Sequence, residues 1–476
     1  MTTNWSTDKL GLLTDLYQLT MGYAYWKNKT YRQEAVFHLY FRTAPFGGKY
    51  AISCGLAAVI DYLKTLRFTV TEIQYLAGLK GSDGKALFDE SYLNYLQRWE
   101  FSCDVDGIPE GTIVFPNEPI LRISGPLLQA QLIETALLNL INFPTLIATK
   151  ATRIVQAAAG DAVLEFGLRR AQGIDGGITA SRAAFVGGCQ STSNVLAGHL
   201  YKIPVKGTHA HSWIMSHESE LIAFERYAEV MPNNCIFLVD TYDTVQGIKN
   251  AITVGLKLKK AGFQMQGIRL DSGDLGAWSK IARTMLDEAG LPEARIVASS
   301  DLDEYKITKL KAEGAQIDIW GVGTKLSTAY DQAALGGVYK LAALKKEGED
   351  WAYKIKLSED AIKTSSPGQL QVKRYFSAGK PVGDMIYDLG TEFAQATIVT
   401  KTQQHPLEDI TRSEELLVPI FKKGRCVYES PSLPQIQQHC KNQLALFSET
   451  ILENYPTGLE KNLHALKEKL RQALLS

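Results

Sequence analysis

Gly267-Ile268-Arg269-Leu270-Asp271-Ser272-Gly273-Asp274-Leu275 is the stretch that decides the fold class of this chain. It begins as a short, mostly apolar β-prone segment and continues as a polar, glycine-containing turn. A helical pattern over 275–289 follows directly. A strand, a polar turn and a helix make one βα unit, and a series of such units builds a parallel sheet. The stretch therefore predicts an α/β fold.

The same order recurs through the middle of the chain. Because ligands of parallel α/β folds bind at the carboxyl ends of the strands, we expect the polar ends to form one rim. A barrel brings such ends together, whereas an open sheet spreads them apart, so we predict an irregular (β/α) barrel. The expected strands are 162–166, 203–205, 235–239, 267–270, 295–298 and 317–320, and the expected helices are 218–230, 244–260, 275–289 and 302–313.

The two flanks of this region have a different pattern, with a helical segment at 10–27 and alternating stretches at 35–41, 113–123, 353–357 and 371–376. We predict a second, mixed α/β domain built from 1–130 and 346–476, with the barrel domain, 131–345, inserted into it. The apolar segment 133–148 is too often interrupted by polar residues to span a membrane, and it predicts a buried or interface helix. A terminal amphipathic helix is expected to present Leu459, Leu463, Leu466, Leu470 and Leu474 on one face.

Composition limits the class of protein. Lys+Arg and Asp+Glu both number 51 in 476 residues, which disfavours a partner that is nucleic acid or a membrane surface. The hydrophobic fraction of 45% is ordinary for a soluble globular protein. Six cysteines without a Cys-x-x-Cys pair indicate free thiols in a reducing compartment. With no secretory signal pattern at the N-terminus, we expect a cytoplasmic protein.

The second chemical signal is Gly207-Thr208-His209-Ala210-His211-Ser212, which follows the expected strand 203–205. In an extended backbone, residues two apart point the same way, so the two histidines are expected to share a face. One hypothesis is a zinc-dependent barrel hydrolase that uses His209 and His211. That site needs further nitrogen ligands, whereas the later strand ends offer Asp240, Asp271 and Asp301. Carboxylates with arginines suit Mg²⁺ and a polyphosphate better.

Three more strand ends carry groups that suit a phosphorylated or flat ligand. Arg269 and Asp271 alternate onto one face, although they are equally typical of an ion pair and a helix cap. Phe166, Arg169 and Arg170 offer a ring face and two cations. Gly321-Val322-Gly323-Thr324 is typical of a phosphate-binding turn, and Lys340 follows closely. Since Leu326 stands where a third glycine would be needed, the turn is no dinucleotide fingerprint.

Together these segments resemble the nicotinate phosphoribosyltransferase family. The matching stretches, in order, are Thr14 to Met21, Glu165 to Gly173, Gly207 to Ser212, Ile268 to Leu275, Gly321 to Thr324 and Lys363 to Gly368. The resemblance spans about 8–380, and the remaining residues are assigned only to completing the second domain. It implies an enzyme of NAD biosynthesis that joins nicotinic acid to 5-phosphoribosyl 1-pyrophosphate, coupled to ATP hydrolysis through a phosphohistidine.

The resemblance also implies roles for residues. His211 matches the phosphorylated histidine, and Asp240 and Asp271 match residues near Mg²⁺ and the ribose. Arg269 completes the expected catalytic set. Tyr17 matches a residue that reaches into the neighbouring subunit's site, which implies a homodimer with shared active sites. The expected substrate-binding residues are Tyr17, Phe166, Arg169, Arg170, Gly207, Thr208, Ser300, Asp301, Gly321, Gly323, Thr324 and Lys340.

Three alternatives stay open beside this hypothesis. The same scaffold can act on nicotinamide or quinolinate, and the choice between nicotinate and nicotinamide depends on a single charge in the base pocket. The zinc hydrolase is an enzyme of a different class. A non-catalytic phosphosugar-binding protein is the third, although binding alone needs no histidine such as His211.

Overall fold

The computed structural model describes residues 10–358, 364–392 and 395–475. Lys363, where one of the matching stretches begins, lies outside the described residues. The chain divides into two compact units, one made of Met1–Thr145 with Ala334–Ser476 and the other of Leu146–Ala333. The central unit is thus inserted into a unit that is built from both ends of the chain. The inserted unit begins at 146 and ends at 333, whereas the sequence suggested 131 and 345. The helix α6 (Glu134–Ala157) crosses the first limit and extends beyond the expected 133–148.

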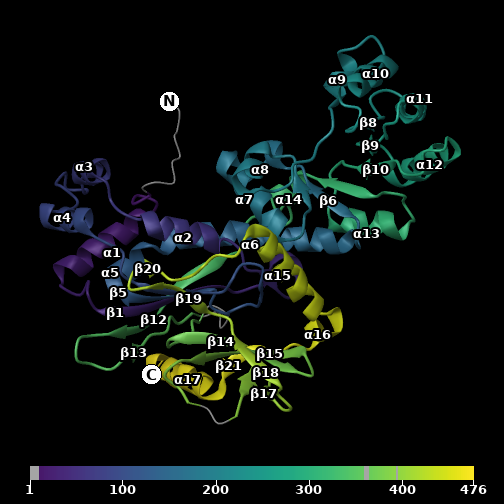
Figure 1. Cartoon of the computed structure of the whole chain (residues 1–476). Coiled ribbons are helices and arrows are strands. Elements are labelled where there is room, and N and C mark those ends of the chain that lie inside the picture. The colour runs from purple at the N-terminus through teal and green to yellow at the C-terminus, as the bar shows by residue number, and fades with distance from the viewer. Residues whose placement is uncertain (1–9, 359–363, 393–394, 476) are drawn as a thin grey trace. The chain divides into compact units, whose positions relative to one another are not determined.

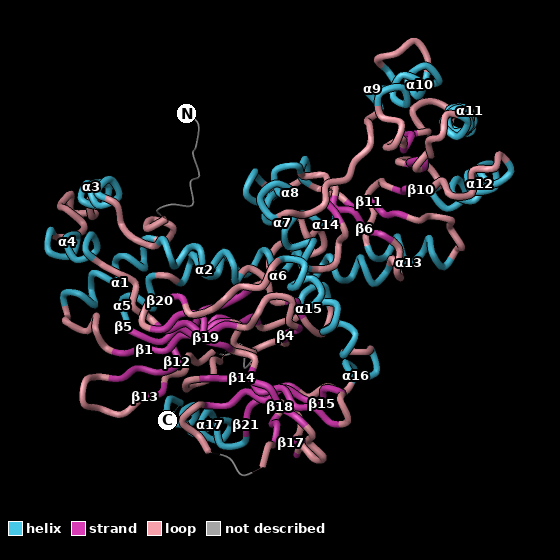
Figure 2. Tube along the Cα trace, viewed as in Figure 1, coloured by secondary structure: helices cyan, strands magenta, loops and turns pink. Residues whose placement is uncertain are grey.

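The inserted unit contains a parallel sheet with the strand order β7-β6-β11-β10-β9-β8. Helices α11, α12 and α13 flank these strands in Figures 1 and 2. The strands are β6 (Ala162–Glu165), β7 (Ser191–Thr192), β8 (Ile236–Leu238), β9 (Gly267–Leu270), β10 (Arg295–Ala298) and β11 (Ile319–Val322). The helices are α7 (Gly173–Val186), α8 (Val195–Tyr201), α9 (His211–Met215), α10 (Glu220–Val230), α11 (Thr244–Lys260), α12 (Leu275–Glu288), α13 (Glu304–Ala312) and α14 (Thr324–Ser327), with a 3₁₀ turn η2 (Leu168–Arg170).

The βα rhythm predicted from the sequence is confirmed, with two corrections. The expected strand 203–205 forms only a single parallel bridge, between Val205 and Thr192, and the sheet contains β7 instead. The strand expected at 317–320 is displaced to β11, so Gly321 lies inside the strand and not in the turn that follows it. Among the described residues the hydrogen-bonded sheet is open, with β7 and β8 at its edges, and a closed barrel therefore stays a prediction.

Aspartate side chains begin three of the helices that follow strand ends. Asp274 accepts the backbone N–H of Ala277 at 3.0 Å at the start of α12. Asp243 caps α11 and Asp303 caps α13 in the same manner, each at 2.8 Å. Each cap satisfies a backbone donor that a helix start leaves without a partner. The caps therefore fix where each turn ends and hold the intervening residues at the strand ends.

The other unit contains two larger sheets and one small one (Figure 2), and the first of the larger sheets draws its strands from both ends of the chain. The first sheet has the order β13 (Ala352–Tyr353), β12 (Gly337–Lys345), β1 (Glu34–Phe41), β5 (Leu121–Pro126), β3 (Asp104–Gly107), β19 (Val418–Lys422) and β20 (Arg425–Cys426). The second has the order β17 (Gln404–Pro406), β16 (Thr397–Val399), β21 (Thr457–Glu460), β15 (Lys380–Asp388), β14 (Leu370–Ser377) and β18 (Arg412–Glu415). The small sheet pairs β2 (Ala51–Ile52) with β4 (Ile113–Val114).

Helices pack around these sheets. Leu459 belongs to β21 and not to the terminal helix, so the expected leucine face of that helix begins only at Leu463. The helices are α1 (Leu16–Lys27), α2 (Leu56–Thr65), α3 (Val70–Gly78), α4 (Glu90–Arg98), α5 (Leu127–Leu132), α15 (Leu433–Leu446), α16 (Glu449–Glu453) and α17 (Lys461–Leu475), with a 3₁₀ turn η1 (Pro45–Gly47).

A buried ion pair joins the two ends of the chain within this unit. Arg374 on β14 and Asp384 on β15 are fully buried and lie 2.6 Å apart. The same guanidinium donates to the carbonyl of Ile113 on β4 at 2.8 Å and to Gln443 on α15 at 2.9 Å. Because a buried charge needs a full set of partners, this pair fixes the C-terminal sheet against the N-terminal segment.

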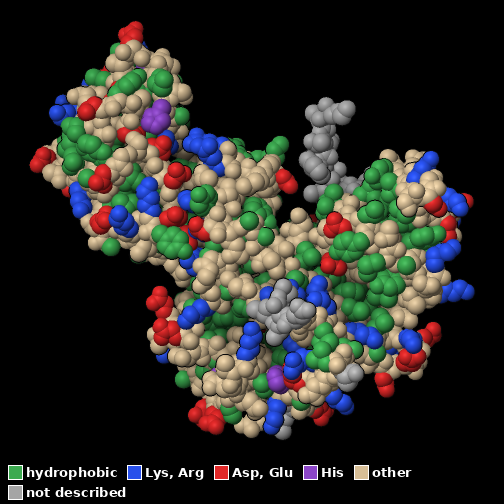
Figure 3. Space-filling view, turned by 180° about the vertical axis from the view of Figure 1, so that it is seen from behind, with side chains coloured by type: hydrophobic (Ala, Val, Ile, Leu, Met, Phe, Trp, Pro, Cys, Tyr) green, Lys and Arg blue, Asp and Glu red, His purple; other side chains and the backbone are tan. Residues whose placement is uncertain are grey.

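The distribution of surface charge and the state of the cysteines agree with the predictions made from the composition. Basic and acidic side chains are interspersed over the face shown in Figure 3. All six cysteines are free thiols. Within the described part of the chain, none of the helices combines the length and the apolar character that a membrane span requires.

Candidate active site

Two aspartates lie side by side at the ends of β8 and β9. Asp240 accepts the backbone N–H of Asp271 at 2.8 Å and the hydroxyl of Ser272 at 2.6 Å, both through Oδ2. Its other oxygen, Oδ1, is buried and has no hydrogen-bond partner in the described part of the chain. A buried carboxylate oxygen without a donor is costly unless a ligand supplies one. One oxygen of the Asp240 carboxylate is therefore hydrogen-bonded within the protein, and the other is available to a ligand.

His211 lies beside these aspartates as the first residue of α9. Its Nδ1 lies 3.0 Å from the Thr241 hydroxyl oxygen, and its Nε2 lies 3.8 Å from Oδ2 of Asp271. The side chain is 40% exposed. One ring nitrogen is thus held by a hydroxyl, while the other faces a carboxylate in the accessible part of the site.

His209 does not share that face, so the prediction from the two-residue spacing is wrong. Its side chain is buried beside Tyr227, at 5.1 Å between ring centroids, and its Nε2 accepts the N–H of Leu238 at 3.4 Å. Burial, together with the positive charge of Arg269, lowers its pKa to about 4. Ala210 has an extended backbone, but it is the N-cap of α9 and His211 is the first helical residue, so the segment does not continue as a strand.

The separation of the two histidines bears on the zinc hypothesis. A zinc site needs both imidazoles and at least one further ligand around one point. In the described residues, no group of three or more His, Cys, Asp or Glu side chains is arranged to hold a metal ion. His209 is instead a core residue that anchors the 207–212 segment against β8.

Arg269 connects that segment to β9. Its guanidinium donates to the Thr208 hydroxyl at 2.8 Å and to the His209 carbonyl at 3.3 Å. Burial is the main cause that lowers the pKa of Arg269, and the positive charge of Arg169 also lowers it. The negative charges of Asp271 and Asp240 raise this pKa but do not outweigh burial. Its Nε is buried without a partner among the described residues. Arg269 therefore holds the loop and retains one donor that an anionic ligand would satisfy.

Phe166 lies against the glycines at the end of β11. A Cβ added to Gly321 would lie 2.8 Å from two carbons of the Phe166 ring, and one on Gly323 would lie 3.2 Å from the Phe166 carbonyl oxygen. A side chain at Gly321 would therefore force the Phe166 ring to shift, and one at Gly323 would be tightly packed. Thr324 begins α14 directly after them. The arrangement places an aromatic ring beside the predicted phosphate turn.

Glu165, at the end of β6, is a residue whose role sequence reasoning missed. It is buried and accepts hydroxyl hydrogen bonds from Thr192 at 2.6 Å and Ser181 at 2.8 Å, and it also accepts the N–H of Gly167. The signal was present as a charged residue inside an apolar strand. Glu165 fixes the start of the turn that carries the exposed Arg169 and Arg170.

Strained backbone marks the end of β10. Ser300 and Asp301 have positive φ angles of 108° and 43°, which are costly for residues other than glycine and concentrate at functional sites. Lys306 donates to the Ser300 carbonyl at 2.8 Å, and the Ser299 hydroxyl donates to Asp271. Besides Glu165, the missed residues are hydroxyls adjacent to the predicted acids, namely Thr241, Ser272 and Ser299.

Two predicted residues belong to the other unit, and a third is an exposed glycine of the inserted unit. Tyr17 on α1 and Lys340 on β12 belong to the other unit, where both interact electrostatically with Glu134. Tyr17 is 48% exposed, and Lys340 donates to its own neighbour's carbonyl, that of Tyr339, at 2.9 Å. Gly207 is exposed, and a Cβ added to it would meet nothing within 4 Å. Within the inserted unit, the structure brings His211, Asp240, Asp271, Arg269 and Thr208 into one cluster.

A parallel sheet whose strand ends bring together a histidine, two aspartates and arginines defines an α/β enzyme that handles anionic substrates. Comparison with known proteins identifies the family. Residues 12–142 match the nicotinate phosphoribosyltransferase N-terminal domain, 162–379 the nicotinate phosphoribosyltransferase family, and 370–467 the corresponding C-terminal domain. The chain belongs to the nicotinate phosphoribosyltransferase family. The match extends to 467, beyond the limit near 380 that the sequence motifs suggested.

Individual relatives agree with this family. The chain is 42% identical to nicotinate phosphoribosyltransferase of Bacillus subtilis, with 98% of each chain covered. It is 37% identical to the Dictyostelium discoideum enzyme of the same name, covering 93% of this chain and 84% of that one. The crystal structure of human nicotinic acid phosphoribosyltransferase matches with a TM-score of 0.84 at 31% identity, covering 96% of this chain and 99% of that one.

Proposed function

We propose that this chain is a nicotinate phosphoribosyltransferase, which joins nicotinic acid to 5-phosphoribosyl 1-pyrophosphate and releases nicotinate mononucleotide and pyrophosphate. The observation that carries the proposal is the cluster of His211, Asp240, Arg269 and Asp271 at adjacent strand ends of a chain in this family. The product would supply NAD biosynthesis by salvage of nicotinate.

The base would bind between the ring of Phe166 and the guanidinium of Arg269. Nicotinate carries a carboxylate, and the unpartnered Nε of Arg269 and the nearby charge of Arg169 suit an anion. Nicotinamide would leave these donors facing an uncharged amide, which is why the acid is the preferred base here. The 5-phosphate is assigned to Gly321, Gly323 and Thr324, with Arg170, Gly207, Thr208, Ser300 and Asp301 around the remaining parts of the substrates.

Transfer of the ribosyl group develops positive charge at the anomeric carbon and negative charge on the departing pyrophosphate. Asp240 or Asp271 would stabilise the ribosyl cation, and Arg269 would orient the base for attack. Mg²⁺ fits the two aspartates, since it typically takes one or two carboxylates together with substrate phosphates, and Asp240 Oδ1 has no other partner among the described residues. When bound, Mg²⁺ would neutralise the pyrophosphate as it leaves.

ATP coupling would proceed through His211. In this step, Nε2 attacks the γ-phosphorus of ATP, the bond to the β-phosphate oxygen breaks, and ADP leaves. Nδ1 of His211 lies 3.0 Å from the Thr241 hydroxyl oxygen, so Nε2 is the ring nitrogen that faces the site. This orientation supports Nε2 as the attacking atom. Water later hydrolyses the phosphohistidine to histidine and phosphate. A phosphoryl group here adds roughly two negative charges beside the pyrophosphate site, which would favour product release.

Three structural expectations belong to the same proposal. The 203–209 segment, bridged to β7 at Val205 and bonded to β8 at His209, would take the place of a strand and complete an irregular barrel. A homodimer would bring Tyr17, together with Lys340, to a shared site, and the exposed position of Tyr17 permits this. The free thiols support a cytoplasmic location.

The deciding experiment is product formation from Mg²⁺, 5-phosphoribosyl 1-pyrophosphate and ATP, with nicotinate in one reaction and nicotinamide in the other. Chromatography is expected to show a mononucleotide from nicotinate only, with ADP released. Product from nicotinamide alone would overturn the assignment of the base pocket. The absence of product from either base, in protein shown to be folded by circular dichroism, would overturn the proposed function.

A further inference from the structure

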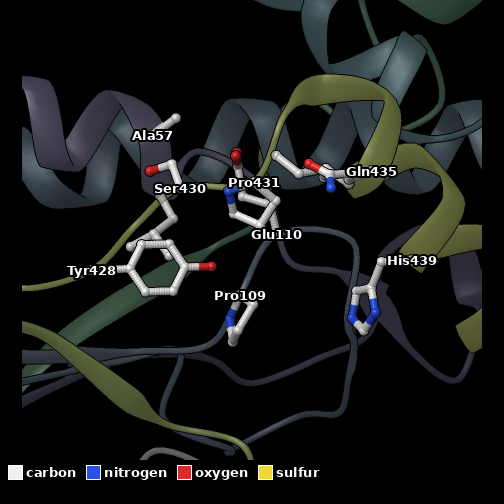
Figure 4. Close-up of a pocket in the computed structure, with 10 residues that line it drawn as sticks. Ala57, Pro109, Glu110, Tyr428, Ser430, Pro431, Gln435 and His439 are labelled. Carbon is white, nitrogen blue, oxygen red and sulfur yellow. The ribbon is translucent and has the colours of Figure 1, made fainter.

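A pocket of about 430 Å³ lies in the unit built from both chain ends, and none of the residues assigned above lines it. Its walls come from the turn between α1 and β1, the last turn of α4 with the loop that follows, and the junction of β5 and α5. The volume lies within the range of about 300–1,000 Å³ that small-molecule sites occupy. A smaller cavity of about 330 Å³ in the same unit, shown beside Tyr428 and His439 in Figure 4, has no arginine among the described residues that line it. Of these two, the larger pocket is thus the one that offers guanidinium groups to a ligand.

Three of the residues that line the larger pocket are aromatic, namely Tyr31, Tyr95 and Trp99. The ring of Trp26 lies 4.6 Å from that of Tyr31 and 4.5 Å from that of Tyr95, measured between centroids. Trp26 does not itself line the pocket, so it supports the two tyrosine rings. Trp99 is 6% exposed and is therefore held by packing. Rings held in this manner give a preformed surface on which a flat ligand can stack.

Hydrogen bonds hold the wall segments of this pocket together. Oε1 of Gln129 accepts the N–H of Ser102 at 2.8 Å and its hydroxyl at 3.1 Å, and Nε2 of Gln129 donates to the carbonyl of Glu100 at 3.1 Å. The N–H of Leu128 donates to the carbonyl of Tyr31 at 3.2 Å. The helix α5 is thus bonded both to the loop after α4 and to the turn before β1. A ligand would therefore bind here with little loss of backbone freedom.

Charged side chains of both signs line the pocket, namely Arg32, Arg98, Glu34 and Glu100. Among the described residues, neither arginine forms an ion pair or a side-chain hydrogen bond. The guanidinium of Arg32 lies 5.2 Å from the centroid of the Tyr31 ring, beside the aromatic surface. A guanidinium group without a carboxylate partner can bind a phosphate through two parallel hydrogen bonds. The two arginines are therefore available to a phosphorylated ligand.

The two glutamates disfavour a ligand that carries negative charge alone. Glu100 is exposed, and its carboxylate has no partner in the described part of the chain. Burial and the negative charge of Asp104 raise the pKa of Glu34, against the opposite effect of Lys345. A cation beside Glu34 would offset that repulsion, and a cation is also attracted to the faces of aromatic rings. The pocket therefore suits a ligand that combines a flat cationic ring with a phosphate.

We propose that this pocket is a second ligand site, which binds a mononucleotide whose base is a positively charged pyridinium ring. The ring would stack on Tyr95 and Trp99 near the glutamates, and the phosphate would bind Arg32 and Arg98. Nicotinate mononucleotide is such a molecule, and the choice of pyridinium among flat cations rests on the proposed function. The site itself rests on the rings and charges that line the pocket.

Nicotinamide mononucleotide is the probe that tests this site in the full-length protein. Binding is followed by fluorine NMR of protein labelled with fluorotryptophan, in which the resonance of Trp99 is assigned with Trp99→Phe. Because Trp99 lines the pocket, its resonance distinguishes binding there from binding at the active site. We expect this resonance to shift as the probe is added. The reduced nucleotide, whose ring is uncharged, and nicotinamide riboside, which lacks the phosphate, are each expected to bind at least tenfold more weakly.

Arg98→Glu reverses one charge at an exposed position. It is expected to weaken binding of the mononucleotide at least tenfold without weakening that of the riboside, which has no phosphate. Arg67→Glu is the matched control, since Arg67 is also exposed, belongs to the same unit and does not line the pocket. Equal affinity for the mononucleotide in these two variants would overturn the proposal.

Two further outcomes would contradict the proposal. Equal binding of the oxidised and reduced nucleotides would overturn the role of the ring charge. An unshifted Trp99 resonance at millimolar probe, in protein shown to be folded, would overturn the site itself. Product formation is measured in a separate reaction, so its absence together with a shifted Trp99 resonance would overturn the proposed function and leave this site supported.

Discussion

The imidazole Nδ1 of His211 and the hydroxyl of Thr241 lie 3.0 Å apart, although 30 residues separate them in the chain. Thr241 follows β8, and His211 begins α9, so the contact forms only when the 207–212 segment lies against that strand. The hydroxyl fixes the orientation of the ring and directs Nε2 toward Asp271. Thr241 is therefore the positioning residue for the proposed phosphoryl transfer.

Replacing Thr241 with valine tests this role. A hydrogen bond of this kind contributes about 1 kcal/mol, so Thr241→Val is expected to lower ATP hydrolysis about five- to tenfold. ATP-independent transfer should be almost unchanged. Thr241→Ser keeps the hydroxyl and should restore the ATP-dependent rate, a rescue that a purely structural role would not require. Equal rates in Thr241→Val and the unaltered enzyme would contradict the assignment.

His211→Ala removes the proposed phosphoryl acceptor. We expect it to abolish ATP hydrolysis but to leave slow, ATP-independent formation of the mononucleotide, because the aspartates and Arg269 remain. The two rates can be measured in the same reaction by chromatography of ADP and of the product. His209→Ala is no control, since His209 is buried. Full ATPase activity in His211→Ala would exclude the phosphohistidine.

Asp240→Asn tests the proposed roles of the Asp240 carboxylate in stabilising the ribosyl cation and in binding Mg²⁺. The amide keeps the shape of the side chain but loses the negative charge, and its NH₂ group cannot accept the two donors that Oδ2 now accepts. We expect the rate of ribosyl transfer to fall about 10²- to 10³-fold, as for the loss of other preorganised charges, and the Mg²⁺ concentration for half-maximal rate to rise. An unchanged Mg²⁺ dependence would argue against a metal at Asp240.

Gly321→Ala tests the packing of Phe166. The added methyl group would meet the ring at 2.8 Å, so the ring must shift. Overpacking of this kind costs about 1–3 kcal/mol, and we expect the KM for nicotinate to rise about tenfold while the protein remains folded. Gly78→Ala is the matched control, because Gly78 has no assigned role in the site and its added methyl group would meet nothing within 4 Å. Equal effects of the two substitutions would contradict a role for Phe166 in base binding.

The stability of the protein should depend on pH through His209. Its pKa is about 4 in the folded protein against an ordinary value of 6.5, so the unfolded chain takes up a proton first as the pH falls. Stability is therefore lost between pH 6.5 and 4, and by pH 5.5 the loss from this group is about 1.4 kcal/mol. The difference in urea midpoint between pH 7.5 and 5.5 should be smaller in His209→Gln. An identical difference in both proteins would show that His209 is not the cause.

Much of the secondary structure and many of the candidate site residues could be predicted from the sequence. The βα rhythm depends on residues close in sequence, such as the apolar run of β9 followed by the Asp274 cap, and it is therefore visible in the sequence. The polar residues after each strand, together with the family resemblance, predicted His211, Asp240, Arg269 and Asp271 as site residues, and the structure brings these four together. The same reasoning failed at His209, because the two-residue period of a strand does not apply where a helix begins.

The α/β class, the inserted arrangement of the chain and the chemical groups at the strand ends could therefore be predicted without the structure. Tertiary structure alone decided which of those groups meet: His211 with Thr241 and Asp271, and Arg269 with the 207–212 loop. It also decided which oxygen of Asp240 stays available to a ligand. The physical reason is that secondary structure follows from neighbouring residues, whereas hydrogen bonds and burial at a site depend on segments tens to hundreds of residues apart.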